Sequence, residues 1–304
     1  MVTKERKIAV LANIGLLGTA VIWGFAFVVV KNSLDLIPPT WMLAFRFTIA
    51  SVVLGLIFIR KMMTIKKETV RQGVILGAFL FLSYLLQTIG CQYTTAGKNA
   101  FLTAIYVVIV PFLHWILNKI RPTSFHVTAA FMAIAGIGLL SLQGDLTMNI
   151  GDVLTIFCGF GYALHMIYID RYTQSNDPVV LTVLQLGFAA AFSWILAPVL
   201  DGGFPAGALE PGIIVGMLYL GLMSTMLAFL LQNVCQKYTT PNAASLFLSL
   251  ESVFGVLFST IFLGERMTPR MIFGCALLLA SIILAETRLS FLPIFKKSEV
   301  VKDV

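Results

Sequence analysis

Charged residues are scarce in this sequence. Only 12% of the 304 residues are Asp, Glu, Lys or Arg, whereas 59% are hydrophobic, and the mean hydropathy is +0.94. A water-soluble domain of this size needs a polar surface that such a composition cannot supply. The scarcity of charge therefore excludes a soluble protein and predicts an integral membrane protein.

Motifs of enzyme active sites and nucleotide-binding loops are missing as well. The sequence contains no His-Glu-x-x-His, no Gly-x-Ser-x-Gly and no Gly-x-x-x-x-Gly-Lys-Ser/Thr. Its four cysteines, Cys91, Cys158, Cys235 and Cys275, lack the spacing of a metal or redox site. We therefore expect no enzyme activity, no cofactor, no metal and no direct use of ATP.

The net charge of +7 does not require a nucleic-acid partner. Lys and Arg gather between the apolar runs, where they can meet anionic lipid headgroups. With the N-terminus inside, most of the 21 Lys and Arg fall in cytoplasmic segments. The distribution predicts a multi-pass protein of the cytoplasmic membrane that has both termini in the cytoplasm, with membrane lipids but no nucleic acid as partners.

Long apolar runs fill most of the chain. A helix needs about 20 apolar residues to cross the roughly 30 Å of hydrocarbon in a bilayer. The runs predict ten membrane-spanning helices, near residues 8–30, 40–60, 71–91, 98–119, 124–143, 151–169, 178–200, 212–235, 242–263 and 268–287. We therefore expect an all-α integral membrane fold.

The chain also contains an internal repeat. The stretch "LLQTIGCQYTT" (85–95) returns as "LLQNVCQKYTT" (230–240), and an offset of 139 pairs the motif Gly73-x-x-x-Gly77 with Gly212-x-x-x-Gly216. Because each half holds five helices, an odd number, the second half must enter the membrane with the opposite orientation. We expect a five-helix repeat over 8–143, a second, inverted repeat over 151–287 and a cytoplasmic tail over 288–304. Inverted repeats are a recurring architecture of secondary transporters, although a duplicated bundle without a pathway would show the same pattern.

Several stretches resemble the drug/metabolite transporter (DMT) superfamily of the EamA type. They are "LGTAVIWGFAFVVVK" (17–31), "LAFRF" (43–47), "QYTTAGKNAFLTAIYVVIVP" (92–111) and "LESVFGVLFSTIFLGERMTP" (250–269). The resemblance implies ten helices, a central cavity and export of small metabolites, often amino acids. Two places depart from the usual pattern, since Ser252 replaces the proline after Glu251, and Asn118-Lys119-Ile120-Arg121 stands where many relatives repeat Gly-Glu.

An acidic residue, Glu251, lies near the centre of the predicted helix 242–263. A carboxylate facing lipid is costly, so we expect Glu251 to face the bundle interior or a cavity. Subtracting the repeat offset of 145 places Tyr106 at the matching point of helix 98–119. We predict that both residues bind substrate at mid-depth and that Glu251 is the candidate for proton coupling.

Polar residues on neighbouring turns extend this candidate site. Asn99 and Thr103 precede Tyr106 at steps of four and three, so they share one helix face. That face either lines a cavity or bonds to adjacent helices. Gln87 and Gln232 are equivalent in the two halves, and they can bind an amide, amine or carboxylate, or bond to each other.

Aromatic residues and one histidine complete the predicted substrate-binding set. Tyr84 shares a helix face with the first of these glutamines, and Trp23 is equivalent to Tyr162 across the repeat. His165 follows Tyr162 by three residues. These side chains can stack on a flat solute, contact a cation or titrate near neutral pH, whereas the alternative is ordinary interior packing.

Two further residues within the predicted helices need an explanation. Arg46 lies in the helix predicted at 40–60, where we expect its side chain to reach toward lipid headgroups, or else to pair with a carboxylate such as Asp35. Pro111 removes one backbone hydrogen bond and predicts a kink just below Tyr106. Such a kink is a candidate gate hinge, although membrane helices also tolerate proline without any function.

The favoured function is a secondary-active transporter that exports small organic metabolites, such as amino acids or related compounds, by alternating access, with proton coupling as an additional hypothesis. A lipid-carrier flippase shares this architecture and remains an alternative, and an intramembrane enzyme is less favoured because its motifs are missing. The sequence does not determine the oligomeric state, and a monomer is compatible with it.

Overall fold

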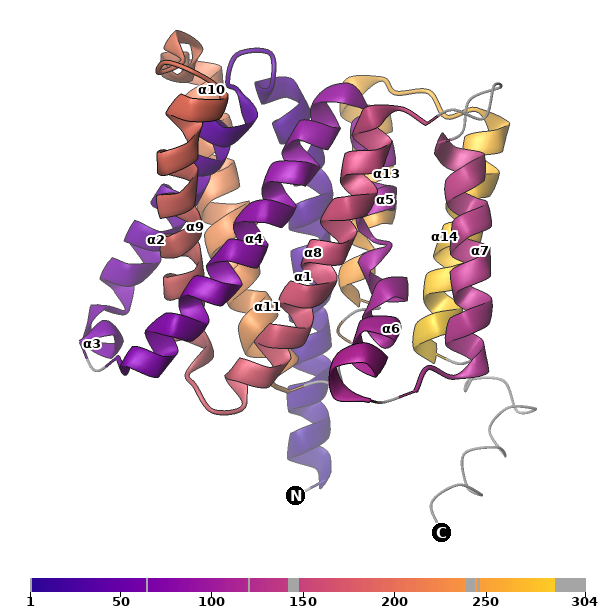
Figure 1. Cartoon of the computed structure of the whole chain (residues 1–304), viewed down its shortest axis with the longest axis horizontal. Helices are drawn as coiled ribbons and strands as arrows, with labels where there is room; N and C mark the ends of the chain where they lie inside the picture. The colour runs from indigo at the N-terminus through magenta and orange to yellow at the C-terminus, as the bar shows by residue number, and fades with distance from the viewer. Residues whose placement is uncertain are drawn as a thin grey trace.

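The computed structural model describes residues 2–63, 65–119, 121–141, 148–238, 244 and 247–287. These residues form a bundle of helices without a β-strand, as predicted (Figure 1). The elements are α1 (Val2–Ser33), α2 (Pro39–Ile57), α3 (Ile59–Met62), α4 (Lys67–Tyr93), α5 (Ala96–Thr103), α6 (Tyr106–Asn118), α7 (Ser124–Ser141), α8 (Ile150–Thr173), α9 (Pro178–Leu200), η1 (Ala206–Leu209), α10 (Pro211–Leu218), η2 (Tyr219–Leu227), α11 (Ala228–Gln236), α13 (Glu251–Leu263) and α14 (Pro269–Thr287). The start of the predicted helix 242–263 and the tail 288–304 lie outside the described residues.

Hydropathy identifies the helices that can cross a membrane. Within the described residues, seven helical segments are long and apolar enough: Ile8–Ser33, Pro39–Ile57, Lys67–Tyr93, Ala96–Leu117, Ile150–Thr173, Pro178–Leu200 and Pro211–Gln236. Three shorter apolar helices, Ser124–Leu140, Phe247–Leu263 and Pro269–Ala285, fall at the remaining predicted positions. The all-helical, membrane-type fold predicted from composition is therefore observed.

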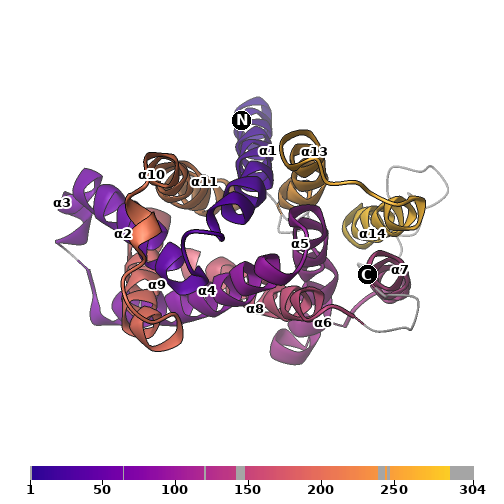
Figure 2. The same cartoon turned by 90° about the horizontal axis from the view of Figure 1, so that it is seen from above.

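Glycines allow several helix pairs to approach closely. A Cβ added at Gly90 of α4 would lie 2.9 Å from the Gly151 carbonyl oxygen of α8, and one added at Gly136 of α7 would lie 3.0 Å from the Gly274 carbonyl oxygen of α14. Such backbone contact replaces the hydrophobic effect as the main attraction between helices in lipid. Seen from above, α7 and α14 accordingly lie side by side at one end of the bundle (Figure 2).

The two Gly-x-x-x-Gly motifs do not have the same surroundings. A Cβ at Gly77 would meet the Phe188 Cβ at 2.7 Å and the Gln185 carbonyl oxygen at 2.9 Å, so this motif packs tightly on α9. In the second half, a Cβ at Gly212 would meet nothing within 4 Å. A Cβ at Gly216 would lie 3.3 Å from Val29 Cγ1 and 3.4 Å from Ser33 Oγ of α1. The two motifs therefore pack on different helices, and the first packs more tightly than the second.

The helix predicted over 98–119 is interrupted. α5 ends at Thr103 and α6 begins at Tyr106, with the N–H of Ile105 donating to the Leu102 carbonyl at 3.3 Å in a tight i→i−3 turn. The predicted span is thus observed as one apolar helical segment, Ala96–Leu117, with a tight turn inside it. Pro111 lies inside α6, away from this break, and its proposed role as a hinge remains a prediction.

The same interruption occurs 145 residues later. The N–H of Leu250 donates to the Phe247 carbonyl at 3.3 Å, and α13 begins at Glu251. Both α6 and α13 have 13 residues, and each ends at a left-handed residue, Lys119 with φ 60° or Gly264 with φ 65°. The repeat thus extends from the amino-acid sequence to the backbone geometry.

The segment Pro211–Gln236 contains another irregular stretch. Its central part, η2, is a π-helix of nine residues. The wider π turn changes which backbone groups are available, and the Ser224 carbonyl accepts a hydrogen bond from Trp23 Nε1 at 2.8 Å. This hydrogen bond joins α1 to the middle of the segment Pro211–Gln236.

Candidate functional site

A central cavity lies among α1, α2, α4, α5, α6, α8, η2, α11 and α13. It encloses about 660 Å³ of space between atoms, including its opening to solvent. All ten residues predicted to bind substrate line this cavity: Trp23, Tyr84, Gln87, Asn99, Thr103, Tyr106, Tyr162, His165, Gln232 and Glu251. Pro111, the predicted hinge, does not line it. The structure thus brings together side chains that are dispersed over more than two hundred residues of sequence.

The two helix breaks place Glu251 and Tyr106 at this cavity. Each is the first residue of its helix, and the two side chains interact with each other. Only 5% of Glu251 and 4% of Tyr106 is exposed.

Gln87 connects three elements of the cavity wall. Its Oε1 accepts a hydrogen bond from the Tyr162 hydroxyl at 3.0 Å, and its Nε2 donates to Thr103 Oγ1 at 3.0 Å. The bond between Gln87 and Gln232 that the sequence left open is not formed. Gln232 Oε1 is buried without a hydrogen-bond partner within the described part of the chain, so it remains an acceptor for a ligand.

Asn99 both lines the cavity and holds helices together, so the two alternatives drawn from sequence apply at once. Its Nδ2 donates to the Gln87 carbonyl at 3.1 Å and to Thr155 Oγ1 at 2.7 Å. Its Oδ1 is buried without a hydrogen-bond partner in the described ranges. Asn99 is therefore fixed by its amide nitrogen and has a free acceptor.

Aromatic rings form a further part of the wall. The Tyr84 ring lies 5.5 Å from that of Tyr162 and 6.0 Å from that of Phe229, and the Trp23 and Phe229 rings are 5.2 Å apart. His165 Nε2 lies 2.9 Å from Gln185 Oε1, and Gln185 itself does not line the cavity. The imidazole thus has the partner expected of an interior histidine while it also faces the cavity.

Arg46 has a different environment from the one predicted. Only 2% of the residue is exposed, and its side chain lines the cavity. Its Nε donates to Thr225 Oγ1 at 2.9 Å and its Nη2 to Ser224 Oγ at 3.0 Å. The expectation that Arg46 reaches toward lipid is therefore wrong, because α2 turns this residue toward η2, and no ion pair with Asp35 is formed.

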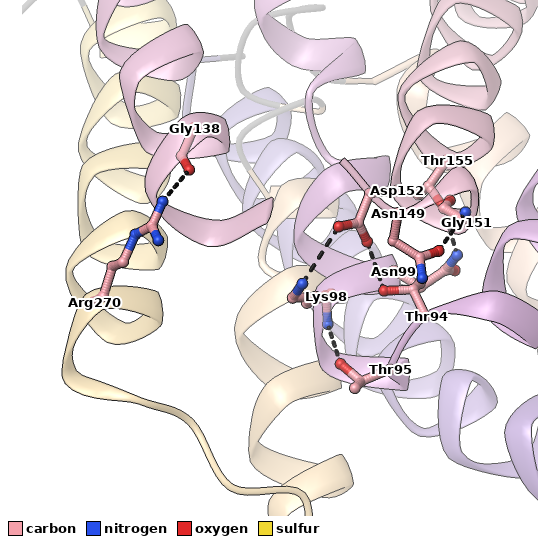
Figure 3. A network of polar contacts seen from close by, with 10 residues as sticks. All are labelled: Thr94, Thr95, Lys98, Asn99, Gly138, Asn149, Gly151, Asp152, Thr155 and Arg270. Carbon is pink, nitrogen blue, oxygen red and sulfur yellow. Dashed lines mark hydrogen bonds and ion pairs between the residues drawn. The ribbon is translucent and has the colours of Figure 1, made fainter. Parts of the chain in front are cut away.

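A polar cluster surrounds the junction of α4 and α5, which we term the α4–α5 corner (Thr94–Lys98). Asp152 of α8 has 0% exposure, accepts a hydrogen bond from Thr94 Oγ1 at 2.5 Å and lies 3.3 Å from Lys98 Nζ. Figure 3 shows Asp152 facing both residues, with Thr155 bonded to Asn99 one turn further along α8. These contacts fix the corner to α8.

Two charged side chains fix the corner to other helices. Lys31 Nζ donates to the carbonyl oxygens of Cys91 and Thr94, each at 2.7 Å, at the C-terminus of α4. Glu265, which follows α13, accepts from the N–H groups of Ala96 and Gly97 at 2.7 and 3.0 Å. Each charge complements the dipole of the helix end it contacts.

The corner lies directly beyond one end of the cavity, because Cys91 lines the cavity and its carbonyl is bound by Lys31. Sequence reasoning missed Lys31, Asp152 and Glu265, since each is a single charged residue near a helix end. Such residues are typical of membrane–water interfaces, and only their partners reveal that they join the corner to other helices.

At the far end of α4, Lys61 Nζ lies 2.6 Å from Asp177 Oδ2, and both side chains are partly exposed. Partial burial raises the pKa of Asp177, but the hydrogen bonds from Lys61 and from the Val179 N–H outweigh this effect and hold the pKa below its ordinary value. Asp177 also caps the N-terminus of α9.

No group of three or more His, Cys, Asp or Glu side chains in the described ranges could hold a metal ion. The cavity can instead offer hydrogen bonds from amides and hydroxyls, ring faces, one carboxylate and one guanidinium. This combination suits binding of a small polar solute.

Comparisons with known proteins agree with this description. The model of the EamA-like transporter family matches residues 10–142 and 149–287. An "Uncharacterized transporter" of Archaeoglobus fulgidus is 32% identical over 91% of this chain and 86% of its own length. A "Probable amino-acid metabolite efflux pump" of Escherichia coli is 24% identical over 91% of this chain and 94% of its own length. A solved structure titled "Crystal structure of protein" has a TM-score of 0.65 at 16% identity, covers 91% of this chain and 98% of its own, and shows a shared fold.

Proposed function

Because the chain belongs to the EamA-like transporter family, we propose that it is a secondary-active transporter that exports small organic metabolites across the cytoplasmic membrane by alternating access. The observation that supports this most directly is the pair of matched helix breaks. They bring Tyr106 and Glu251, 145 residues apart, to one cavity. Secondary transporters place substrate sites at discontinuous helices between inverted repeats.

We place ten helices across the membrane in two inverted repeats, over 8–143 and 151–287, with both termini and the tail 288–304 in the cytoplasm. The family model matches once in each half. The equal lengths and equal left-handed ends of α6 and α13 support the repeat independently of side chains. In this arrangement, interchange of the two halves' conformations would open the cavity alternately to each side.

The proposed solutes are amino acids or related compounds. The cavity lining offers amides, hydroxyls, aromatic rings, one carboxyl group and one guanidinium, a combination that can bind both charged groups of an amino acid. One relative is described as a probable amino-acid metabolite efflux pump. Since a single chain provides the whole cavity, a monomer suffices for transport.

Glu251 is the proposed proton carrier. It lies in the cavity without an ion pair to any Lys, Arg or His of the described residues. A buried carboxylate of this kind is costly unless it binds a proton or a cationic group. Alternate binding of a proton and a solute at one carboxylate would couple export to the proton gradient.

The test is uptake into proteoliposomes of a labelled panel of amino acids and other metabolites, with and without a pH gradient. We expect gradient-driven uptake by the wild type and its loss in Glu251→Gln. The matched control is Glu210→Gln, because Glu210 is exposed before α10 and its side chain makes no capping bond. Both variants should retain the wild-type melting temperature within a few degrees.

Different results separate the parts of this proposal. Equal uptake by wild type and Glu251→Gln would remove the proton role and keep the transporter. If no soluble solute moved, but long-chain lipids bound and were translocated, the protein would be a lipid-carrier flippase. Conversion of any panel compound into a product would instead identify an intramembrane enzyme.

A further inference from the structure

Arg46 is a buried cation at the cavity whose contacts are all neutral. Its Nε and Nη2 donate to the hydroxyls of Thr225 and Ser224 at 2.9 and 3.0 Å. Its guanidinium carbon lies 4.6 Å from the centre of the Tyr84 ring. These contacts orient the guanidinium plane but carry no negative charge to balance it.

No carboxylate of the described residues lies within ion-pair distance of Arg46. A guanidinium has five N–H donors, and only two of them have partners here. Buried charges are normally paired, because an uncompensated one costs several kcal/mol. A structural role in joining α2 to η2 accounts for the two bonds, but it leaves the charge itself unexplained.

The acidic and basic groups of the cavity lining narrow the chemical class of the solute. Among the described residues that line the cavity, Arg46 supplies a guanidinium and Glu251 a carboxyl group. A phosphate dianion would face one cation and one carboxylate, an unfavourable combination. A carboxylate accompanied by an ammonium group matches both charges.

Tyr84 and Tyr162 link the two charged positions. Both tyrosines line the same cavity as Arg46 and Glu251, and the Tyr84 ring lies 4.6 Å from the Arg46 guanidinium carbon. The two rings are 5.5 Å apart and nearly perpendicular. They form a wall against which the uncharged part of a solute would pack between the guanidinium and the carboxylate.

We propose that Arg46 binds the carboxylate group of the transported solute and thereby selects zwitterionic, amino-acid-like compounds. A guanidinium fork binds a carboxylate through two parallel N–H···O bonds, which a lysine cannot reproduce. The ammonium group of such a solute faces Glu251. This inference rests on the proposed function and adds the residue that recognises the carboxylate of the solute.

The test uses proteoliposomes that contain the full chain and pairs of compounds differing in one group: L-leucine, L-phenylalanine and L-threonine, each with its carboxamide. The amide retains the amine and loses the negative charge. We expect wild type to take up at least one of the acids, and its amide about 10- to 100-fold less well, as for loss of one charge-assisted contact. Arg46→Gln should lower uptake of that acid to the level of its amide, and Arg46→Lys should retain part of it.

The matched control is Arg270→Gln, because Arg270 is exposed, donates to the Gly138 carbonyl and lies outside the cavity lining. It should transport like wild type. Uptake of amides as efficient as that of the acids, or wild-type uptake by a folded Arg46→Gln, would overturn the inference and leave the transporter intact. If Arg46→Gln does not fold, the acid–amide comparison in wild type decides alone. The inference is also refuted if the protein transports only solutes that lack a carboxylate. Absence of any transport refutes the proposed function as well.

Discussion

The carboxylate of Glu265 offers a direct test of alternating access, because it joins the end of α13 to the α4–α5 corner beyond one end of the cavity. Its two oxygens accept from the N–H groups of Ala96 and Gly97 at 2.7 and 3.0 Å. The proposed mechanism requires this corner to separate from α13 when that end of the cavity opens. The two hydrogen bonds then exist in the closed state and not in the open one.

The size of the effect follows from these two bonds. In Glu265→Gln the side-chain oxygen can still accept one N–H, but the amide nitrogen would face the other donor. Loss of one hydrogen bond to a charged group costs about 1.5–3 kcal/mol. A value of about 2 kcal/mol raises the ratio of open to closed molecules about 30-fold.

A native cysteine reports this change. Cys91 lines the cavity next to the corner and is 1% exposed, so its thiol should react with a membrane-impermeant methanethiosulfonate only in the open state. In oriented vesicles, with reagent on the side that carries the corner, we expect Glu265→Gln to react up to about 30-fold faster than wild type. Cys91→Ser identifies the signal, and Glu210→Gln controls for loss of an exposed carboxylate.

An unchanged rate of Cys91 labelling in a folded Glu265→Gln would refute this reasoning. It would mean that the corner does not separate from α13 during the cycle, or that other contacts dominate the closed state. Faster labelling of all four cysteines would indicate general destabilisation instead of opening at one end. The melting temperature distinguishes these cases from the expected result.

Three further predictions concern stability. Gly77→Ala should lower the free energy of unfolding by about 1–3 kcal/mol relative to Gly187→Ala, because Gly77 packs against α9 whereas a Cβ at Gly187 meets nothing within 4 Å; denaturation in mixed micelles measures both. Lys119→Gly should raise the free energy of unfolding by about 0.5–1 kcal/mol in the same assay, because Lys119 has φ 60°. Lys61→Gln should lower the melting temperature slightly at neutral pH, because it removes the partner of Asp177. The pKa of Asp177 is lower in the folded than in the unfolded protein, so the stabilisation exists above about pH 4 and is lost as the pH falls through the folded pKa. Melting scans from about pH 7 to pH 3 should therefore show the difference between variant and wild type disappearing.

Each of these predictions has a result that contradicts it. Equal stability of the two alanine variants would show that α4 and α9 adapt to the added methyl group without cost. Gly264 has the same left-handed backbone as Lys119, so Gly264→Ala should lower the free energy of unfolding, whereas Lys119→Gly should raise it. A result with either sign reversed would contradict this reasoning. A melting-temperature difference for Lys61→Gln that persisted in acid would assign the effect to packing of the lysine stem.

Much of the architecture could be predicted from the amino-acid sequence. A helix that crosses a bilayer needs about 20 apolar residues in succession, so hydropathy alone located Pro39–Ile57 and Pro178–Leu200 within three residues of their observed ends. The repeat offset of 145, read from the sequence alone, related Tyr106 to Glu251. The structure then showed the same tight backbone turn before both residues. The ten candidate residues all reached one cavity, because an intramembrane polar group avoids lipid.

Only the tertiary structure decided the partners of single charged residues. Lys31, Arg46 and Glu265 look alike in sequence, because one charge in or beside an apolar helix is compatible with lipid anchoring, an ion pair or a helix cap. The break before Tyr106 was likewise invisible, since a tight turn of Leu102, Ala104 and Ile105 has the composition of a helix. Hydropathy is a property of each residue along the chain, whereas a hydrogen-bond partner depends on which helix packs opposite, and packing brings together residues more than a hundred positions apart.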